Sequence, residues 1–263
     1  MDLNRIYNMD CLEGMKEIPD ESIDCIICDL PYGTTACAWD SVIPFAPLWE
    51  QYKRIRKPYA PICLFGSEPF STLVRMSNLN EFKYDWIWVK SQGSGFVHAK
   101  NQPLKNFEVI SMFCSYPMGH ISQLGDKRMP YNPQGLRLVN KLCTHGKERT
   151  VNVYGSRPSH KDEFIREYEN YPNAVIKFSS EREGRFHPTQ KPVELIRYLI
   201  RTYSNPGDTI LDNCMGSGTT AVAAVMEKRK FIGFETNKEY FDKANDRLKQ
   251  LTGPFYIYGN IGV

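Results

Sequence analysis

The sequence lacks any long apolar run, and no stretch of its 263 residues approaches the ~20 consecutive apolar residues that a membrane-spanning helix requires. Its first five residues, Met1 to Arg5, also lack the apolar core of a secretory signal peptide. Internal repeats and low-complexity tracts are absent as well. We therefore expect a soluble protein of the cytoplasm with no membrane partner.

An excess of charge of one sign is missing too, because 33 Lys and Arg nearly balance 30 Asp and Glu. The net charge of +3 does not demand a polyanionic partner, although it leaves room for a local basic face. With 24% charged and 41% hydrophobic residues, the composition is that of a globular protein. The length predicts one domain, or one domain with a substantial insertion.

The eight cysteines lack the spacing of a zinc site or a disulfide framework. Cys25 and Cys28 form the only Cys-x-x-Cys pair, and no second pair or His pair follows at ligand spacing. Both lie in an apolar run that predicts a buried strand, in which an offset of three residues directs them to opposite faces. We expect reduced cysteines in the core and no metal, which agrees with a cytosolic setting.

Short apolar runs alternate with helical stretches at both ends of the chain, and this alternation predicts an α/β fold with a largely parallel sheet. The expected strands are 23–28, 61–66, 84–90, 108–113, 209–212 and 230–234, and the expected helices are 44–56, 68–76, 193–203, 220–228 and 240–251.

Residues 115–183 differ in character from both ends. Gly, Pro, Tyr and Asn are frequent there, periodic apolar runs fade, and basic residues accumulate among the aromatic ones. Such an irregular segment is typical either of a nucleic-acid-reading insertion or of a solvated loop region, and composition alone does not separate the two. On the first interpretation, phosphate contacts come from Lys127, Arg128, Arg137, Lys141 and Lys147, with Lys100 from a preceding loop.

A glycine turn after the expected strand 209–212 carries the first chemical signal. Residues 216–221 fit G-x-G-x-x-A, and Glu235 follows 17 positions after Gly218 at the tip of the next strand. Glycines let the backbone approach a ligand, and a carboxylate so placed accepts hydrogen bonds from ribose hydroxyls. The alternative is a tight structural turn with a solvated acid. Only 28 residues follow Glu235, so the rest of the sheet must come from upstream, beside the half that carries Asp29.

The second signal is Asp29-Leu30-Pro31-Tyr32, at the end of the first expected strand. The Asp29 carboxylate and the Leu30 carbonyl can accept both N–H groups of an exocyclic amine, Pro31 fixes the turn, and Tyr32 offers a face for base stacking. Alone, the tetrapeptide is also compatible with an ordinary strand-ending turn. Because ligands of open α/β sheets bind outside the carboxyl ends of the strands, we expect Asp29, Asp212 and Glu235 to share one crevice.

Together, Asp29–Tyr32 and Leu211–Thr220 resemble the motifs of the β-class DNA amino-methyltransferases, the N4-cytosine/N6-adenine family that uses S-adenosylmethionine. The chain follows this family's order of catalytic motif, target-recognition region and cofactor motif. Asn8–Cys11 is similar to the segment that contacts the cofactor adenine, and His187–Pro192 to the run before the helix that covers the methionine end. The resemblance is strongest to the standalone enzymes of phages and prophages.

The resemblance implies a Rossmann-like, circularly permuted methyltransferase fold with an inserted target-recognition region. Residues 1–114 form the catalytic half, 115–183 the insertion and 184–263 the cofactor-binding half. Two departures from the family pattern are Leu30 in place of the first Pro, and Asn213 and Cys214 in place of Pro and Phe. The implied catalytic residues are Asp29, Leu30, Pro31 and Tyr32, and the implied cofactor contacts are Asp10, Cys11, Asp29, His187, Lys191, Asp212, Asn213, Gly216, Ser217, Gly218, Thr219 and Glu235.

The implied activity is methyl transfer to a base flipped out of double-stranded DNA. The acidic first residue of the catalytic motif favours adenine N6 by family tendency, while cytosine N4 stays open and RNA is a further alternative. A DNA-binding protein without turnover and a nicotinamide-dependent oxidoreductase are rivals from other classes. The resemblance allows a homodimer, leaves a restriction endonuclease partner open, and points to a bacterial cell or a phage-infected host.

Overall fold

A computed structural model describes residues 1–34, 40–116, 124–144, 163–179 and 190–256. The chain divides into two compact units, the first comprising Met1–Asn132 with Ala174–Val263 and the second Pro133–Asn173. The second unit lies inside the segment 115–183 that the sequence singles out. Among the described residues, no helix has the length and apolarity needed to cross a membrane.

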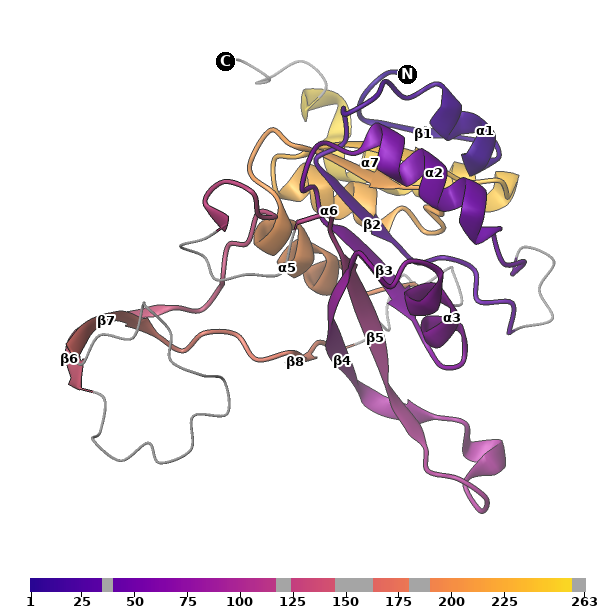
Figure 1. Cartoon of the computed structure of the whole chain (residues 1–263). Coiled ribbons are helices and arrows are strands. Elements are labelled where there is room, and N and C mark those ends of the chain that lie inside the picture. The colour runs from indigo at the N-terminus through magenta and orange to yellow at the C-terminus, as the bar shows by residue number, and fades with distance from the viewer. Residues whose placement is uncertain (35–39, 117–123, 145–162, 180–189, 257–263) are drawn as a thin grey trace. The chain divides into compact units, whose positions relative to one another are not determined.

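The first unit is built on an eight-stranded sheet in the order β1-β10-β9-β2-β3-β5-β4-β8 (Figure 1). Only the pairs that involve β5 are antiparallel, so the sheet is largely parallel, as the sequence predicts. The strands span Arg5–Tyr7 (β1), Cys25–Cys28 (β2), Ile62–Gly66 (β3), Phe82–Ser94 (β4), Lys105–Phe113 (β5), Val175–Lys177 (β8), Thr209–Asp212 (β9) and Lys230–Phe234 (β10).

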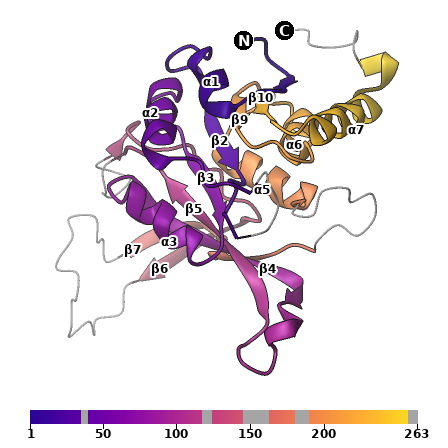
Figure 2. The same cartoon turned by 90° about the vertical axis from the view of Figure 1, so that its right-hand side faces the viewer.

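Helices cover both faces of this sheet, which explains why its central strands read as continuous apolar runs (Figures 1 and 2). One apolar cluster packs α1, α2 and α3 against one face, and the other packs α5, α6 and α7 against the opposite face. This three-layer arrangement confirms the predicted α/β Rossmann-like fold. The helices span Cys11–Lys16 (α1), Phe45–Ile55 (α2), Phe70–Ser77 (α3), Val193–Tyr203 (α5), Thr219–Met226 (α6) and Lys238–Tyr256 (α7), with a short 3₁₀ turn at Phe96–His98 (η1).

The two thiols of the Cys-x-x-Cys pair point to opposite faces of β2. Cys25 belongs to the cluster under α5 and α6, whereas Cys28 belongs to the cluster under α1 and α2. Both are fully buried, and the seven cysteines that the structure describes are free. The prediction of reduced core cysteines is therefore confirmed for the five that are buried, whereas Cys143 and Cys214 are partly exposed.

Strands β2 and β9 join the two halves of the chain at the centre of the sheet. They pair in parallel with Cys25 opposite Ile210 and Ile26 opposite Leu211. The chain runs from β2 to β3 on one side of this pair and from β9 to β10 on the other, which makes the pair the topological switch point of the sheet. The predicted packing of the Asp29 half beside the Gly216 half is thereby confirmed.

Several elements differ from the sequence prediction. Strand β1 was not predicted, because three residues are too few to show a period. Strands β4 and β5 extend well beyond the expected 84–90 and 108–113 into a hairpin that ends at η1. Beyond Lys90 the sequence turns to Ser, Gln and Gly without apolar alternation, and the pairing resumes only after a register shift, with Ser94 opposite Lys105.

The second unit contains two antiparallel strands, Arg137–Thr144 (β6) and Glu163–Glu169 (β7). The expectation of an irregular segment is wrong here. Leu142 lies opposite Ile165 and Leu138 opposite Tyr168, so apolar side chains pair across the strands even though they are exposed. The sequence does not predict these strands because neither has a buried face. Apolar and polar residues therefore alternate too weakly along them to indicate a strand.

Gly218 provides a test of how the glycine turn packs. Its φ is +74°, and a Cβ at this position would lie 2.9 Å from the Cβ of Ala244 on α7. Gly207 has a φ of +90° with nothing within 4 Å of such a Cβ, so it is a matched control for backbone strain. We expect Gly207→Ala to lower the free energy of unfolding by about 1–2 kcal/mol and Gly218→Ala by a further ~1–3 kcal/mol from overpacking.

Urea unfolding of the two variants measures this difference. Equal losses would show that α7 yields to the added methyl group and that only the backbone conformation requires glycine.

Candidate active site

A pocket of about 590 Å³ opens at the carboxyl ends of the central parallel strands. Asp29 follows β2, Asp212 ends β9 and Glu235 follows β10, and all three line this pocket, as the sequence predicts. The volume lies within the roughly 300–1,000 Å³ of typical small-molecule sites. Segments distant in sequence also contribute to the described wall, among them the start of α1, residues 40–44, strands β4 and β5, and the residues before α5.

The pocket is strongly acidic. Its described lining contains six carboxylates and two ammonium groups, which gives a net charge of −4 when all are ionised. A site of this charge attracts a cationic ligand and repels the pyrophosphate of a dinucleotide. The charged lining residues are Asp10, Asp29, Asp40, Glu108, Asp212 and Glu235, with Lys90 and Lys191.

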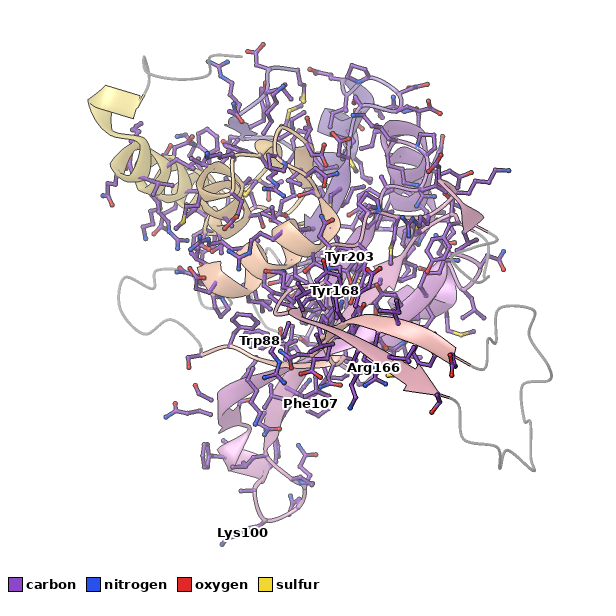
Figure 3. All side chains as sticks on the ribbon, turned by 90° about the vertical axis from the view of Figure 1, so that its left-hand side faces the viewer. Trp88, Lys100, Phe107, Arg166, Tyr168 and Tyr203 are labelled. Carbon is purple, nitrogen blue, oxygen red and sulfur yellow. The ribbon has the colours of Figure 1, made fainter. Side chains whose placement is uncertain are left out.

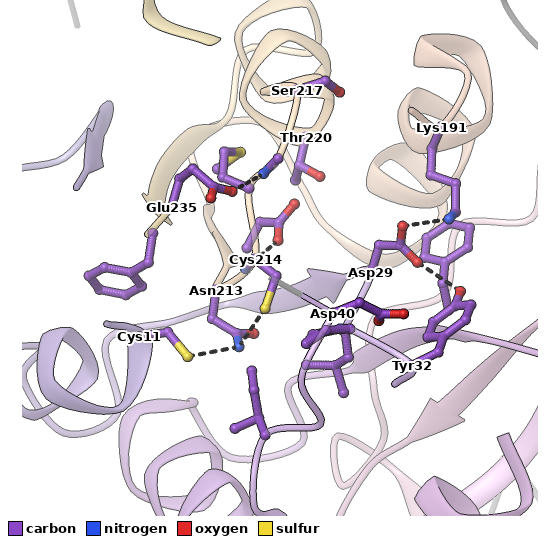
Figure 4. Close-up of a pocket in the computed structure, with 18 of the residues that line it drawn as sticks. Cys11, Asp29, Tyr32, Asp40, Lys191, Asn213, Cys214, Ser217, Thr220 and Glu235 are labelled. Carbon is purple, nitrogen blue, oxygen red and sulfur yellow. Dashed lines mark hydrogen bonds and ion pairs between the residues drawn. The ribbon is translucent and has the colours of Figure 1, made fainter. Parts of the chain in front are cut away.

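The Asp29 carboxylate is held from two sides (Figure 4). The Tyr32 hydroxyl donates to its Oδ1 at 2.8 Å, and the Lys191 ammonium donates to its Oδ2 at 2.5 Å. Burial raises the pKa of Asp29 above its ordinary value, although the positive charge of Lys191 opposes that shift. The ring of Tyr32 stacks on Phe70 with 4.9 Å between centroids, so one of its faces is covered.

Asp40 fixes the loop that follows Asp29. Its carboxylate accepts hydrogen bonds from the backbone N–H groups of Gly33 at 2.8 Å and Thr34 at 2.9 Å. Gly33 has a φ of +66°, a left-handed conformation that favours glycine. The turn thus has support beyond Pro31, which allows Leu30 to replace the family's first Pro.

The resemblance implies that Lys191 contacts the cofactor, and Lys191 does line the pocket. Its Nζ is buried between Asp29 at 2.5 Å and Glu108 Oε2 at 3.3 Å. Burial would lower the pKa of Lys191, but the two carboxylates overcome this and raise it. Lys191 is therefore a charged partner of the predicted catalytic carboxylate.

Sequence reasoning missed Glu108 and Lys90, which form an ion pair across β5 and β4. Burial raises the pKa of Glu108, whereas the positive charges of Lys191 and Lys90 lower it. The net shift of this pKa is downward. A signal was present in the two-residue period of the strands, which places each charge on the same face as a buried residue. Trp88 is buried two positions before Lys90, and Ile110 is buried two positions after Glu108, so both charges fall on inward-facing positions.

The glycine turn and Glu235 hold each other in place. The Glu235 carboxylate accepts hydrogen bonds from the backbone N–H of Gly216 at 2.8 Å and of Asn237 at 2.7 Å. Burial raises its pKa, and these two hydrogen bonds oppose the rise. Ser217 and Thr219 also line the pocket, whereas Gly218 lies outside the lining and serves the packing of α6 against α7.

Asp10 and Asn213 have structural partners at the same end of the pocket. The Asp10 carboxylate caps α1 by accepting hydrogen bonds from the backbone N–H groups of Leu12 and Glu13. The Asn213 amide accepts a hydrogen bond from the buried Tyr52 hydroxyl and lies 3.5 Å from the Cys11 sulfur. The polar side chain that replaces the family's Pro is therefore satisfied in the core.

The predicted DNA contacts are scattered over both units. Lys100 lies at the far end of the β4–β5 hairpin (Figure 3), and Lys127 and Arg128 belong to the first unit, whereas Arg137 and Lys141 lie on β6. His187 and Lys147 lie outside the described residues. Arg137 pairs with Glu169.

The described part of the second unit is electrically neutral. It carries three basic residues and three acidic ones, so the basic excess that the sequence shows in this region is not found on the described strands. The three basic residues are Arg137, Lys141 and Arg166, and the three acidic ones are Glu163, Glu167 and Glu169.

Asp212 gives a test of the electrostatic strain in the pocket. Burial raises its pKa to about 6, although hydrogen bonds from Thr220 and the Cys214 backbone oppose the rise. Because the folded pKa exceeds the unfolded one, its stabilising contribution is complete below pH 4 and is lost as the pH rises through 6, a total of about 3 kcal/mol. Between pH 5 and 8 we expect Asp212→Asn to gain about 1–1.5 kcal/mol of unfolding free energy relative to the unchanged protein.

Urea unfolding of both ligand-free proteins at the two pH values measures this gain. Asp246→Asn, at an exposed carboxylate on α7, is the control and should show no comparable change. A difference between Asp212→Asn and the unchanged protein that is the same at pH 5 and pH 8 would contradict the account.

Comparisons with known proteins agree with this geometry. The chain is 29% identical over 274 residues to the Type II methyltransferase M1.MboII of Moraxella bovis, covering 95% of this chain and 98% of the relative. It is 30% identical over 259 residues to the DNA adenine methyltransferase YhdJ of Escherichia coli K12, covering 92% of this chain and 82% of the relative. The crystal structure of M1.HpyAVI in complex with SAM shares the fold, with a TM-score of 0.60, 24% identity, and coverage of 92% and 98%.

A family model described as DNA methylase, of the N6 and N4 methyltransferases, matches residues 23–246. This match covers most of the chain and includes both motifs, Asp29–Tyr32 and the glycine turn. The resemblance inferred from those motifs is confirmed, and the chain belongs to the DNA methylase family.

Proposed function

We propose that the protein transfers a methyl group from S-adenosylmethionine to the exocyclic N6 of adenine in double-stranded DNA. One observation carries this proposal: a partly buried carboxylate followed by a rigid turn and an aromatic ring opens onto an acidic pocket beside a glycine turn. A carboxylate that can accept a hydrogen bond from an amine and a site for a cationic cofactor thus share one cavity. Methylation of an amine requires both.

The pocket suits S-adenosylmethionine by charge and by the type of its polar groups. This cofactor supplies an electrophilic methyl group on a positively charged sulfur. The net charge of −4 on the described lining matches that cation and disfavours a nicotinamide dinucleotide. Glu235 would accept hydrogen bonds from ribose hydroxyls, and the glycine turn, Asp212 and Asn213 would surround the remainder of the cofactor.

Asp29 and the backbone carbonyl of Leu30 would activate the amine. An exocyclic amine is a poor nucleophile because its lone pair is conjugated into the ring. Hydrogen bonds from both N–H groups would move the nitrogen toward sp³ geometry, and the Asp29 charge would stabilise the positive charge that develops on nitrogen. Positioning for in-line attack supplies the rest of the acceleration, and no covalent enzyme intermediate is needed.

The target base must leave the duplex to reach this pocket. Phe70 already covers one face of the Tyr32 ring, so the flipped base would stack on the other face. Such stacking contributes about 1–3 kcal/mol per base. The Tyr32 hydroxyl also orients Asp29, which couples base stacking to the position of the acceptor.

Adenine is favoured over cytosine by two observations. The motif begins with an acid, which resembles the adenine enzymes, and the relative from Escherichia coli is named a DNA adenine methyltransferase. The family also contains N4 enzymes, and both bases present the same kind of amino group, so N4 of cytosine is the second candidate.

The region 115–183 would read the target sequence, and 1–114 and 184–263 would form the two halves of the catalytic domain. Basic residues supply the phosphate contacts, with Lys100 reaching DNA from the end of the β4–β5 hairpin. We place the enzyme in the cytoplasm of a bacterial or phage-infected cell, and the family resemblance allows a homodimer.

Replacement of Asp29, the predicted hydrogen-bond acceptor for the target amine, tests the proposed chemistry. Asp29→Ala should lower methyl transfer to DNA at least about a hundredfold, because it removes preorganised stabilisation of charge on the amine. Binding of S-adenosylmethionine, measured by calorimetry, should persist, because the other five carboxylates of the described lining remain. Asp20→Ala, at an exposed carboxylate remote from the pocket, is the control. Normal turnover by Asp29→Ala would refute this assignment.

A further inference from the structure

Both oxygens of the Asp29 carboxylate already have donors in the ligand-free protein. Tyr32 donates to Oδ1 at 2.8 Å, and Lys191 donates to Oδ2 at 2.5 Å (Figure 4). Each oxygen can accept a second hydrogen bond, so a target amine would share one of them with the donor already present, and the shared hydrogen bonds would be weaker. The short contact with Lys191 is the competitor that matters, because an ammonium binds a carboxylate more strongly than an amine N–H does.

A second acceptor for Lys191 lies on the neighbouring strand. Glu108 Oε2 is 3.3 Å from the Lys191 Nζ, and it is buried without a hydrogen-bond partner in the described part of the chain. The ion pair with Lys191 offsets part of the cost of burying this oxygen, and a closer approach of the ammonium would complete a hydrogen bond to it. Its partner oxygen, Oε1, is held by Lys90.

Lys90 keeps Glu108 in place for that contact. It pairs with Glu108 from β4, and its Nζ lies 5.1 Å above the centroid of the buried Trp88 ring. Two ammonium groups and two carboxylates thus form a chain in the order Lys90, Glu108, Lys191 and Asp29, with no net charge.

We propose that Glu108 is a positioning residue that accepts Lys191 when the target amine binds, and so frees the Asp29 oxygen for that amine. The inference rests on the proposed function and deepens it. The Lys191 Nζ lies 3.3 Å from Glu108 Oε2, and a charge-assisted hydrogen bond measures roughly 2.7–2.9 Å. A small shift of the ammonium toward Glu108 is therefore enough to form this bond. Without Glu108, its departure from Asp29 would leave a buried ammonium unpaired, which is strongly unfavourable.

Lys191 and Glu108 shift the pKa of Asp29 in opposite directions. The positive charge of Lys191 lowers the pKa of Asp29, whereas the negative charge of Glu108 raises it. Removing Glu108 should therefore move the acid limb of kcat/KM to lower pH, and removing Lys191 should move it to higher pH. The other groups that face Asp29 are Tyr32, Asp212 and Cys28, which both variants retain.

The experiment measures kcat, KM for DNA and the pH profile of kcat/KM for the full-length protein. Glu108→Gln should lower kcat at the plateau by about ten- to a hundredfold, the usual loss when a partner that orients a functional ligand is removed. KM for DNA should change little, and the acid limb should move to lower pH. Lys191→Met should move the acid limb in the opposite direction.

Glu227→Gln is the matched control. Glu227 is as buried as Glu108, with side-chain exposures of 11% and 12%, and it also pairs with two cations, Arg197 and Arg201, but it does not line the pocket. The control should keep the pH profile of the unchanged protein. Circular dichroism and the thermal midpoint establish that each variant is folded.

Each outcome decides the proposal. If Glu108→Gln lowers kcat at the plateau but leaves the acid limb unmoved, Glu108 has only a structural role and the proposed movement of Lys191 is refuted. A pH profile identical to that of the unchanged protein would also refute it. These results require that the unchanged protein methylates DNA. Absence of transfer by the unchanged protein would instead refute the proposed function, so the two failures are distinguishable.

Discussion

The parallel pairing of β2 with β9 is the contact on which the active site depends. Two register pairs, extended by a backbone hydrogen bond from Asp24 to Thr209, join segments almost 200 residues apart in the sequence. The pairing places Asp29 and Asp212 at the ends of adjacent strands, and β10 brings Glu235 alongside. Because all three strands run in the same direction, their carboxyl ends and the polar groups that follow them converge on one crevice.

That convergence has an electrostatic cost. Burial raises the pKa values of Asp29, Asp212 and Glu235 together, because the loss of water around each ionised carboxylate outweighs the stabilisation from its partners. The protein offsets part of this cost with Lys191 and with backbone N–H groups. A cationic ligand would relieve the remainder, so the strain is both a constraint on stability and the basis for selecting a cofactor.

The sequence predicted those features that are encoded in local patterns. The apolar strands, the opposite faces of Cys25 and Cys28, and the convergence of the three acids all follow from period and chain direction. The Lys90–Glu108 pair was missed because it depends on the register of two antiparallel strands, which the sequence does not specify. The contact of Lys191 with Asp29 was missed because it joins residues 162 positions apart that meet only in the folded chain. The strands of the second unit were missed because their apolar side chains stay exposed and resemble a loop composition.

The proposed activity is tested most directly by mass analysis of nucleosides from duplex DNA incubated with the protein and S-adenosylmethionine. We expect N6-methyladenine that appears only when both the protein and the cofactor are present. N4-methylcytosine would agree with the proposed chemistry of Asp29 and contradict the assigned base. No methylated nucleoside, from a protein that demonstrably binds the cofactor, would refute the proposed methyl transfer to DNA.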